Sequence, residues 1–474
     1  MLKLDAKALA TAGRNIPVPF DLALPDGRIL TVERLLRVLP GKRVVGRARL
    51  DDQVVLVKFF VAARSEQHWQ RELAGLRAFD AAGLPTPGLL EAMPLKGAGH
   101  VLLTRFLPDA ESLASLWQAN SDDAQRMQRL FPVMSLLAQM HAAGLAQADL
   151  HLGNFLVAQG RYYVIDGDAV THAQPQGALS TAARLDNLAI LFAQLPPSWD
   201  GRISPLLQHY LAAADGMQFD AAALQERIIA VRQRRLKEFL GKLGRDCTQF
   251  AVDRDFSRFS VVDRNTLESL RDVLAAPDLA LENGRRLKSG GTCTVADVSS
   301  GGQRMVIKRY NLKHWRHALS RIWRPSRAWH AWREGHRLAF YDIATPRPLV
   351  MIEERWGVLR RRAFLVTEFC AGRSLLDLLD AQQVPDGQMA EAIVTVFRTL
   401  CDLRITHGDL KASNLLWADG RVVLIDLDAT QQHTTEQGFQ RAWRRDRARL
   451  LRNWPADAPL VRWLDAVLPQ IKPH

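Results

Sequence analysis

Four short apolar runs each end at a single charged residue. They are residues 54–57 ending at Lys58, residues 162–165 ending at Asp166, residues 305–307 ending at Lys308 and residues 422–425 ending at Asp426. Runs of this length that are rich in β-branched, aliphatic and aromatic residues predict strands. Each predicted strand presents one charged side chain at its end, and the order of a lysine strand followed by an aspartate strand occurs twice.

Helical patterns follow both lysine strands. Arg71-Glu72 and Arg333-Glu334 each open a stretch in which an apolar residue stands four positions after the glutamate, the spacing of one helix face. Two further strand-like runs come next, at 101–106 and 364–369. Another helix, with one apolar stripe and many basic residues, is predicted over 227–245.

The polar positions of the two halves repeat at a fixed offset of 260 residues. The pairs are Asp149 and Asp409, Asn154 and Asn414, Asp166 and Asp426, Asp168 and Asp428, and Asp186 and Asp446. Several positions that repeat in register over a domain-sized interval indicate that the chain contains two copies of one domain.

The repeated pattern suits phosphoryl transfer from a nucleotide. That reaction needs a positioned nucleotide, a divalent metal and a carboxylate at the acceptor hydroxyl. In the second half, Asp409 could serve the hydroxyl, while Asn414 and Asp426 could bind the metal. Because Mg²⁺ prefers oxygen ligands and keeps several waters, two side chains are enough to hold it.

Residues 407–414, which read HGDLKASN, resemble the catalytic loop of the protein-kinase-like superfamily, H-x-D-L-x-x-x-N. In the first half Gln147 stands in place of the histidine. Neither half has the D-F-G motif, because residues 166–168 read Asp-Gly-Asp and residues 426–428 read Asp-Leu-Asp. These departures are more similar to the sugar and small-molecule kinases of the superfamily than to regulated protein kinases.

The resemblance implies an α+β fold with two tandem protein-kinase-like domains. Each would have a small β-rich N-lobe and a mainly helical C-lobe. A chain of 474 residues has room for two such domains. We place them at 1–265 and 266–474, since residues 253–278 are mixed and polar and the next predicted strands begin near Leu281.

The resemblance also implies roles for residues in both halves. The implied catalytic residues are Asp409 and Asp149, and the implied Mg²⁺ ligands are Asn414, Asp426, Asn154 and Asp166. The residues implied to bind ATP are Lys308, Glu334, Lys58, Glu72, Gly290, Gly291, Thr367, Glu368 and Phe369, of which the last three form the hinge beside adenine. Each lysine is expected to orient the ATP phosphates and to be held by the glutamate of the next helix. We favour the second half as the active copy, because it keeps His407 and has the better glycine turn.

Two of the repeated acidic pairs can be read as structural residues. Asp168 and Asp428 could be turn or helix-cap residues rather than ligands. Asp186 and Asp446 are expected to be structural residues that anchor the catalytic loop.

Composition limits the remaining choices. The four cysteines are scattered and form no C-x-x-C pair, so neither a zinc site nor a disulfide framework is expected. The sequence has no apolar stretch long enough to span a membrane, and its first residues lack the apolar block of a signal peptide. We therefore expect a cytoplasmic protein.

The chain is basic, with a formal net charge of +13 and a pI of about 9.9, which favours an anionic partner. Residues 309–333 contain seven Lys and Arg residues, no acid and four tryptophans. This mixture favours peripheral contact with an anionic membrane or glycolipid. A solvated helix face remains an alternative, and nucleic acid is the least favoured one.

Taken together, the D-x-D motifs, the sugar-kinase-like first loop, the basic Trp-rich segment and the overall charge resemble the lipopolysaccharide core kinases. This resemblance implies ATP, Mg²⁺ and a glycolipid acceptor, a heptose or Kdo sugar of the inner core, at the cytoplasmic face of the inner membrane. Two alternatives stay open: an atypical protein Ser/Thr kinase, and a pseudokinase that acts as a scaffold in envelope assembly.

Overall fold

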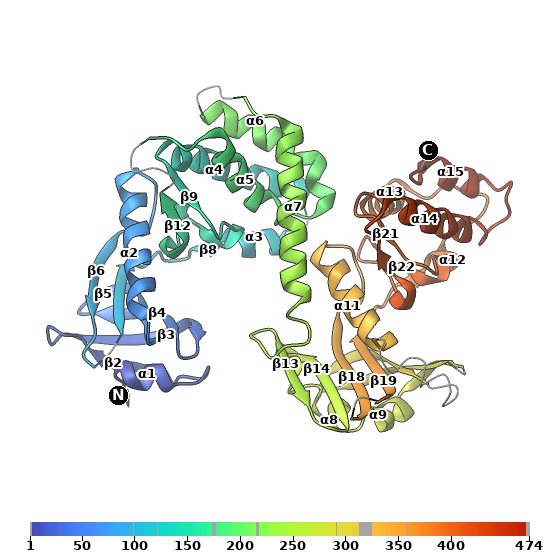
Figure 1. The fold of residues 1–474 in the computed structure, drawn as a ribbon, viewed down its shortest axis with the longest axis horizontal. Coiled ribbons are helices and arrows are strands. Elements are labelled where there is room, and N and C mark those ends of the chain that lie inside the picture. The colour runs from blue at the N-terminus through green and yellow to red at the C-terminus, as the bar shows by residue number, and fades with distance from the viewer. Residues whose placement is uncertain are drawn as a thin grey trace. The chain divides into compact units, whose positions relative to one another are not determined.

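The computed structural model describes residues 2–97, 99–120, 122–172, 177–214, 218–290, 292–311, 325–357 and 359–470. The chain divides into two compact units, the first formed by 1–195 with 199–232 and the second by 196–198 with 233–474. Each unit combines a β-sheet with a helical part (Figure 1). The expected α+β class is confirmed. None of the described helices is long and apolar enough to cross a membrane.

The elements of the first unit follow one another along the chain. They are β1 (Leu2–Lys3), α1 (Ala6–Thr11), β2 (Phe20–Ala23), β3 (Ile29–Leu39), β4 (Arg43–Leu50), β5 (Gln53–Phe60), α2 (Ser65–Ala81), β6 (Leu89–Pro94), β7 (His100–Arg105), β8 (Glu111–Ser112), α3 (Leu113–Ala119), α4 (Asp123–Ala142), β9 (Leu145–Gln147), η1 (Leu152–Asn154), β10 (Phe155–Ala158), β11 (Arg161–Val164), η2 (Gly167–Ala169), β12 (Val170–His172), α5 (Thr181–Phe192), η3 (Pro197–Arg202), α6 (Ile203–Ala213) and α7 (Ala221–Leu240), within which the division between the units falls.

The elements of the second unit begin after α7. They are β13 (Phe250–Arg254), β14 (Arg258–Asp263), η4 (Arg264–Thr266), α8 (Arg271–Ala275), α9 (Pro277–Asn283), β15 (Arg285–Ser289), β16 (Cys293–Ser300), β17 (Gln303–Tyr310), α11 (Arg327–Phe340), β18 (Pro348–Trp356), β19 (Leu359–Glu368), β20 (Arg373–Ser374), α12 (Leu375–Leu378), α13 (Gly387–Asp402), β21 (Ile405–Thr406), η5 (Ala412–Asn414), β22 (Leu415–Ala418), β23 (Arg421–Leu424), η6 (Leu427–Ala429), β24 (Gln431–Gln432), α14 (Glu436–Leu451) and α15 (Pro459–Val467).

The large sheets of the two units share a five-stranded core. The strand orders are β1-β2-β3-β4-β5-β7-β6 and β13-β14-β18-β19-β17-β16-β15. The run β3-β4-β5-β7-β6 thus matches β15-β16-β17-β19-β18 read in the opposite direction. The first sheet adds β1 and β2 beside β3, whereas the second adds β13 and β14 beside β18.

The added strands explain where the second unit begins. Strand β14 pairs with β18 in antiparallel register, with Val261 opposite Met351, and β13 pairs with β14. Residues 250–263 therefore belong to the second unit's sheet. The boundary expected at residue 265 lies after these strands, whereas the compact units divide between Arg232 and Gln233.

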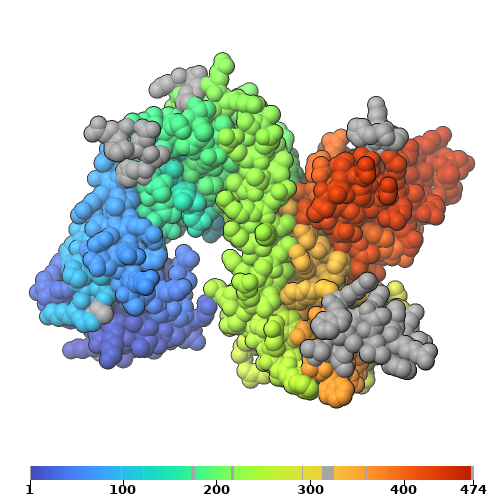
Figure 2. Space-filling view, viewed as in Figure 1, coloured from blue at the N-terminus to red at the C-terminus, as the bar shows by residue number. Residues whose placement is uncertain are grey.

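The sheet and the helical part of each unit have their own hydrophobic clusters. In β5 the alternating residues Val55, Val57 and Phe59 are buried, as expected for β-branched and aromatic side chains on one face of a sheet. In the second unit, Phe397 and Trp443 belong to a separate cluster among the helices. In the space-filling view, the residue-number colours separate the sheet part from the helical part within each unit (Figure 2).

The helices that carry the two expected glutamates begin earlier than the sequence pattern indicates. Helix α2 starts at Ser65 and α11 at Arg327, so Glu72 and Glu334 each lie seven residues after the first helical residue. Ser326 caps α11, since its hydroxyl accepts from the backbone N–H of Trp329 at 3.0 Å. Such a cap satisfies one N–H group that the first turn leaves without a partner.

Only part of the Trp-rich segment 309–333 can be compared with its expected role, because residues 312–324 lie outside the described residues. Within the described part, Trp332 is completely buried and packs edge-on against Phe250 and His336. Trp329 is half-buried. The membrane role expected for the tryptophans is therefore wrong for Trp332, whose ring belongs to the core.

Candidate active site

A cavity of about 350 Å³ lies in the second unit, lined by its sheet, by helix α11 and by the loops around η5 and η6. Much of the cavity wall is apolar. Its Leu, Val and Ile residues come both from the large sheet and from the region of η5 and η6: Leu287, Val295, Val306, Leu365, Leu416, Ile425 and Leu427. The cavity is of the size and character that small-molecule sites commonly have.

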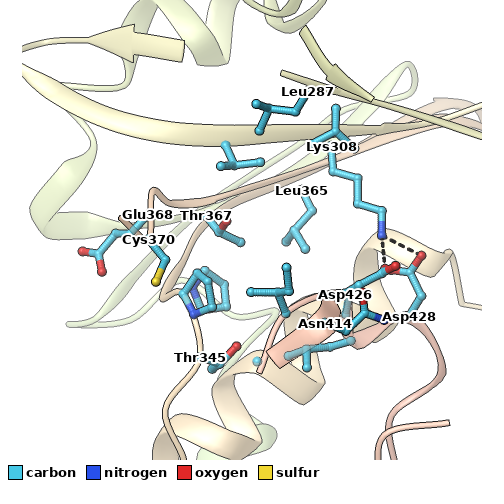
Figure 3. Close-up of a pocket in the computed structure, with 18 of the residues that line it drawn as sticks. Leu287, Lys308, Thr345, Leu365, Thr367, Glu368, Cys370, Asn414, Asp426 and Asp428 are labelled. Carbon is cyan, nitrogen blue, oxygen red and sulfur yellow. Dashed lines mark hydrogen bonds and ion pairs between the residues drawn. The ribbon is translucent and has the colours of Figure 1, made fainter. Parts of the chain in front are cut away.

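Polar groups lie at both ends of this cavity (Figure 3). Thr367, Glu368 and Phe369, the expected hinge, line one end, and the charged end holds Lys308, Asn414, Asp426 and Asp428. The structure therefore brings together residues separated by more than a hundred positions in the sequence. An apolar slot between a strand end and a cluster of charges can hold a flat heterocycle that carries phosphates.

Lys308 reaches across the charged end to two carboxylates. Its ammonium donates to Asp426 Oδ1 at 2.5 Å and to Asp428 Oδ2 at 2.8 Å. Burial disfavours the charged ammonium, but Asp428 and Asp426 outweigh this effect and raise the pKa of Lys308. Burial would likewise raise the pKa of Asp426, yet its attraction to Lys308 lowers that pKa overall. The pair is thus fully charged at neutral pH.

Asp428 lines the cavity and binds Lys308, so its role goes beyond that of a turn residue. Besides Lys308, it accepts a hydrogen bond from the Tyr310 hydroxyl at 2.6 Å and pairs with Arg327 at 2.5 Å. Burial and then Asp428 raise the pKa of the Tyr310 phenol well above its ordinary value. The sequence contained one signal for this role, the repetition of the same aspartate at the 260-residue offset.

Glu334 does not hold Lys308 in this structure. Its buried carboxylate pairs instead with Arg337, three residues further along α11, at 2.7 Å. The expected Lys308–Glu334 pair is therefore replaced by pairs of Lys308 with the two aspartates. Of the expected glycine turn, Gly290 lies between β15 and β16, where its N–H donates to the carbonyl of Cys293 at 3.1 Å, and Gly291 lies outside the described residues.

The expected catalytic residue of the second half is held from two sides. Asp409 pairs with Arg449 of α14 at 2.6 Å through Oδ1 and with Lys411 at 3.0 Å through Oδ2. Asn414 donates through its amide nitrogen to the backbone carbonyl of Asp409 at 2.9 Å. This bond leaves the amide oxygen of Asn414 as the atom that can bind a cation.

The loop that carries Asp409 is anchored as expected. The side chain of His407 bonds to the carbonyl of Ile425 at 2.9 Å through Nε2. The buried carboxylate of Asp446 accepts the backbone N–H of His407 at 2.6 Å and that of Gly408 at 3.0 Å. Burial raises the pKa of Asp446. The structural role predicted for Asp446 agrees with these contacts.

The first unit assembles the equivalent residues differently. Lys58 pairs with Glu72, which is completely buried, as expected for this half. Glu72 also accepts the backbone N–H groups of Gly167 at 3.3 Å and Asp168 at 3.2 Å. In the first unit the helix glutamate therefore joins the lysine strand to the segment that follows Asp166.

Two glycines account for this difference between the units. A Cβ atom at Gly75 would overlap the carbonyl oxygen of Gly167, and one at Gly167 would lie 2.5 Å from the carbonyl oxygen of Glu72. Helix α2 can therefore approach η2 closely only because both residues lack a side chain. In the second half the corresponding residues are Arg337, three positions after the glutamate, and Leu427, and Arg337 pairs with Glu334.

Arginine and histidine side chains surround the second aspartate of the first half. Asp168 pairs with Arg43 at 2.8 Å, with Arg71 at 2.9 Å and with His68 at 3.0 Å. Burial would raise the pKa of Asp168, but His68 and Arg43 lower it overall. Arg43 also lies 3.9 Å from Asp166, so its guanidinium brings a positive charge next to an expected metal ligand. No sequence pattern pointed to Arg43.

The first catalytic loop uses a different anchor. Gln147, which stands in place of the histidine, donates to the carbonyls of Ile165 and Asp166 at 2.8 Å. Asn187 donates to the carbonyl of Gln147 at 2.8 Å, whereas Asp186 makes an exposed pair with Arg227 at 2.8 Å. The anchoring role expected for Asp186 is therefore wrong, because the neighbouring residue takes it.

The expected metal ligands have oxygen atoms suited to a cation. In the first unit, Asn154 Oδ1 and Asp166 Oδ1 are buried and have no hydrogen-bond partner, which is costly unless a ligand satisfies them. Asp149, the expected catalytic residue, is exposed at the same loop. In the second unit, Asp426 and Asp428 already bind a positive charge, because both accept hydrogen bonds from the Lys308 ammonium. Within the described ranges, no group of three or more His, Cys, Asp or Glu residues is arranged around a common metal position.

Two stretches of the chain, one in each half, match the same family model. Residues 58–193 and 282–461 match the model described as the lipopolysaccharide kinase (Kdo/WaaP) family. A stretch of 93 residues, 19% of this chain, is 37% identical to the 3-deoxy-D-manno-octulosonic acid kinase of Photobacterium profundum. The matched stretch spans 39% of the length of that curated relative.

Proposed function

The chain belongs to the lipopolysaccharide kinase (Kdo/WaaP) family, and from this premise we propose that it transfers phosphate from ATP to a sugar hydroxyl of the lipopolysaccharide inner core. The acceptor would be a heptose or 3-deoxy-D-manno-octulosonic acid, the sugar named in the function of the curated relative. The observation that carries the proposal is the cavity that gathers Lys308, the hinge residues, Asn414 and Asp426.

We further propose that each unit is a kinase-like domain and that the second one performs the transfer. The five-stranded core and the catalytic loop occur in the same order in both units, which supports the tandem arrangement. The cavity beside Lys308 and the anchored loop around Asp409 support the choice of the second unit.

The residues of the second unit would divide the reaction between them. Lys308 would orient the ATP phosphates, since its ammonium already lies at the charged end of the cavity. Asp409 would accept a hydrogen bond from the sugar hydroxyl and take its proton late in the transfer. Arg449 and Lys411 hold the Asp409 carboxylate from both sides, which fixes its direction before the acceptor arrives.

When bound, Mg²⁺ would neutralise the charge on the phosphate oxygens during transfer. Asn414 and Asp426 would hold it in the second unit, and Asn154 and Asp166 in the first. The buried Oδ1 atoms of Asn154 and Asp166, neither of which accepts a hydrogen bond, support a cation site there, which a bound ion would share with the nearby Arg43 guanidinium.

The proposed place of action is the cytoplasmic face of the inner membrane, where ATP and a growing core glycolipid meet. The net charge of +13 supports peripheral contact with an anionic surface, partly through the basic segment 309–333. Fractionation of cells at low and high salt tests this contact, because a peripheral electrostatic association is lost as ionic strength rises.

The kinase proposal is tested by transfer of labelled phosphate from ATP to purified core oligosaccharide. Asp409→Asn keeps the size of the side chain and should lower the rate ~10²–10⁴-fold, the usual contribution of acid–base catalysis. Asp149→Asn should leave most of the activity, and Asp457→Asn, at an exposed position of the same unit, is the matched control.

Each possible result has a definite meaning. Loss with Asp149→Asn and retention with Asp409→Asn would transfer catalysis to the first unit. If the intact protein phosphorylates a protein but no core sugar, it is a protein kinase, and if it transfers no phosphate at all, the scaffold alternative replaces the enzyme.

A further inference from the structure

A second cavity in the second unit is lined mainly by arginines, and we propose that it binds a phosphate group carried by a sugar or a lipid headgroup. The cavity has a volume of about 310 Å³. It shares no lining residue with the cavity beside Lys308. It is therefore a site in addition to the one proposed for ATP.

The charged residues that line this cavity give it a net positive charge, which favours binding of an anion. The charged residues that line it are Arg245, Arg254, Arg355, Arg360 and Glu353, which leaves a formal charge of +3. Glu353 is buried and pairs with Arg355 at 2.5 Å and with Arg360 at 3.4 Å. In the part of the chain that the structure describes, no ion pair involves the side chains of Arg245 or Arg254.

Guanidinium groups are well suited to phosphate. Their planar forks donate two parallel hydrogen bonds to one phosphate, and they hold their charge at any physiological pH. In this cavity the buried carboxylate of Glu353 orients two of the guanidiniums before a ligand arrives. A phosphate would thus meet donors that are already arranged, which lowers the entropy lost on binding.

Aromatic rings complete the walls. The guanidinium carbons of Arg254 and Arg355 each lie 4.6 Å from the centroid of the Phe259 ring. The ring centroids of Trp329 and Phe259 lie 5.9 Å apart. A Cβ atom at Gly244 would lie 3.0 Å from the Trp329 indole. Glycine at 244 therefore leaves room for the indole, whose apolar surface can support the ring of a sugar that carries the phosphate.

The cavity also gives a role to the described end of the basic Trp-rich segment. Pro325 and Trp329 belong to 309–333 and both line the cavity. The tryptophan that is half-buried contributes to this site, while Trp332 belongs to the core. The described end of the segment thus contributes apolar wall to this cavity, whose charge comes from arginines outside the segment.

The experiment measures binding of two phosphate monoesters by the full chain, with saturating ADP and Mg²⁺ to occupy the nucleotide cavity. Glucose 6-phosphate, followed by calorimetry, presents the group in solution. Vesicles of phosphatidylcholine with or without phosphatidic acid, followed by flotation, present it at a lipid surface. The double variant Arg245→Ala/Arg254→Ala leaves the pairs of buried Glu353 intact, so it should remain folded.

The double variant should weaken binding of whichever probe the intact protein binds by ~10-fold or more, since a charge-assisted hydrogen bond contributes enough for such a change. The control Arg271→Ala/Arg462→Ala removes the same charge from exposed positions outside the cavity and should bind as the intact protein does. Binding of the soluble ester alone identifies a sugar phosphate, and binding of the vesicles alone identifies a lipid headgroup.

Three results would overturn the site: binding of neither probe, an unchanged affinity in the double variant, or an equal loss in the control, which would indicate only diffuse surface charge. Because the readout is binding and not phosphate transfer, its failure is distinguishable from failure of the proposed kinase activity. A Trp329→Leu variant gives a second check, with weaker binding expected for the sugar phosphate.

Discussion

Replacement of Asp446 by alanine should loosen the second catalytic loop, while the same replacement of Asp186 should leave the first loop unchanged. The two residues are equivalent by the 260-residue repeat, but their surroundings differ. Asp446 is buried and accepts two backbone N–H groups, whereas the Asp186 side chain is 66% exposed and pairs with Arg227.

The free-energy cost of Asp446→Ala follows from the backbone N–H groups that would lose their acceptor. Removing the acceptor of a buried N–H costs ~1–3 kcal/mol, and the N–H of His407 belongs to a residue that is 1% exposed. Gly408 is exposed, so water can replace its lost acceptor at a smaller cost. A total of about 3 kcal/mol corresponds to roughly a hundredfold change in an equilibrium constant. An exposed ion pair such as Asp186–Arg227 contributes at most about 1 kcal/mol.

Amide hydrogen exchange read by mass spectrometry measures both loops in one sample. In Asp446→Ala, peptides that contain residues 407–409 should exchange about a hundred times faster, because local opening has become easier. In Asp186→Ala, peptides that contain residues 147–149 should exchange at the original rate. Asn187→Ala should accelerate exchange there, since Asn187 holds the carbonyl of Gln147. Equal acceleration by Asp186→Ala and Asp446→Ala would refute the reasoning.

Three further predictions concern other contacts. Burial lowers the pKa of His336 from 6.5 to about 3, so this residue binds more protons in the unfolded chain between these pH values. Its contribution to the free energy of unfolding should therefore fall by about 1.4 kcal/mol per pH unit below 6.5. His336→Phe should reduce the stability difference between pH 7 and pH 5 measured by urea unfolding, and an unchanged difference would contradict the shift. Gln147→His should keep the first loop's exchange rate within a few-fold, since His407 makes the matching bond to the carbonyl of Ile425, and a large acceleration would contradict that equivalence. Gly75→Ala should lower the thermal midpoint of the first unit and weaken its binding of ADP, because the new Cβ overlaps Gly167; an unchanged midpoint would show that α2 moves without cost.

The sequence predicted that residues far apart in the second half would lie close together, and the structure places three of them around one cavity, while their roles stay a prediction. Lys308 lies within β17, Asn414 ends η5 and Asp426 follows β23, and all three line one cavity. The α+β class followed from the periodic apolar runs, whose side-chain alternation is a property of the local chain.

Other contacts depended on packing that no single segment contains. Glu334 pairs with Arg337 because η6 presents Leu427 where the first unit has a glycine, and this difference lies almost a hundred residues away in the chain. The anchor of the first loop moved by one position, from Asp186 to Asn187, which a fixed repeat offset cannot show. Trp329 and Trp332 share the three-residue spacing of one helix face, a pattern that a buried face and a membrane-facing one have in common.

The close approach of Gly75 and Gly167 makes the two units differ in how the position of the helix that carries Glu72 or Glu334 can be adjusted. In the first unit, every side chain larger than hydrogen at position 75 meets a backbone oxygen, so α2 must move as a body and carry Glu72 away from Lys58. Intermediate positions of the helix are not accessible by substitution there. In the second unit, residues 337 and 427 are Arg and Leu, whose side chains can be shortened one group at a time. Selection or design can therefore tune the second unit in small steps, whereas the first can only keep its arrangement or lose it.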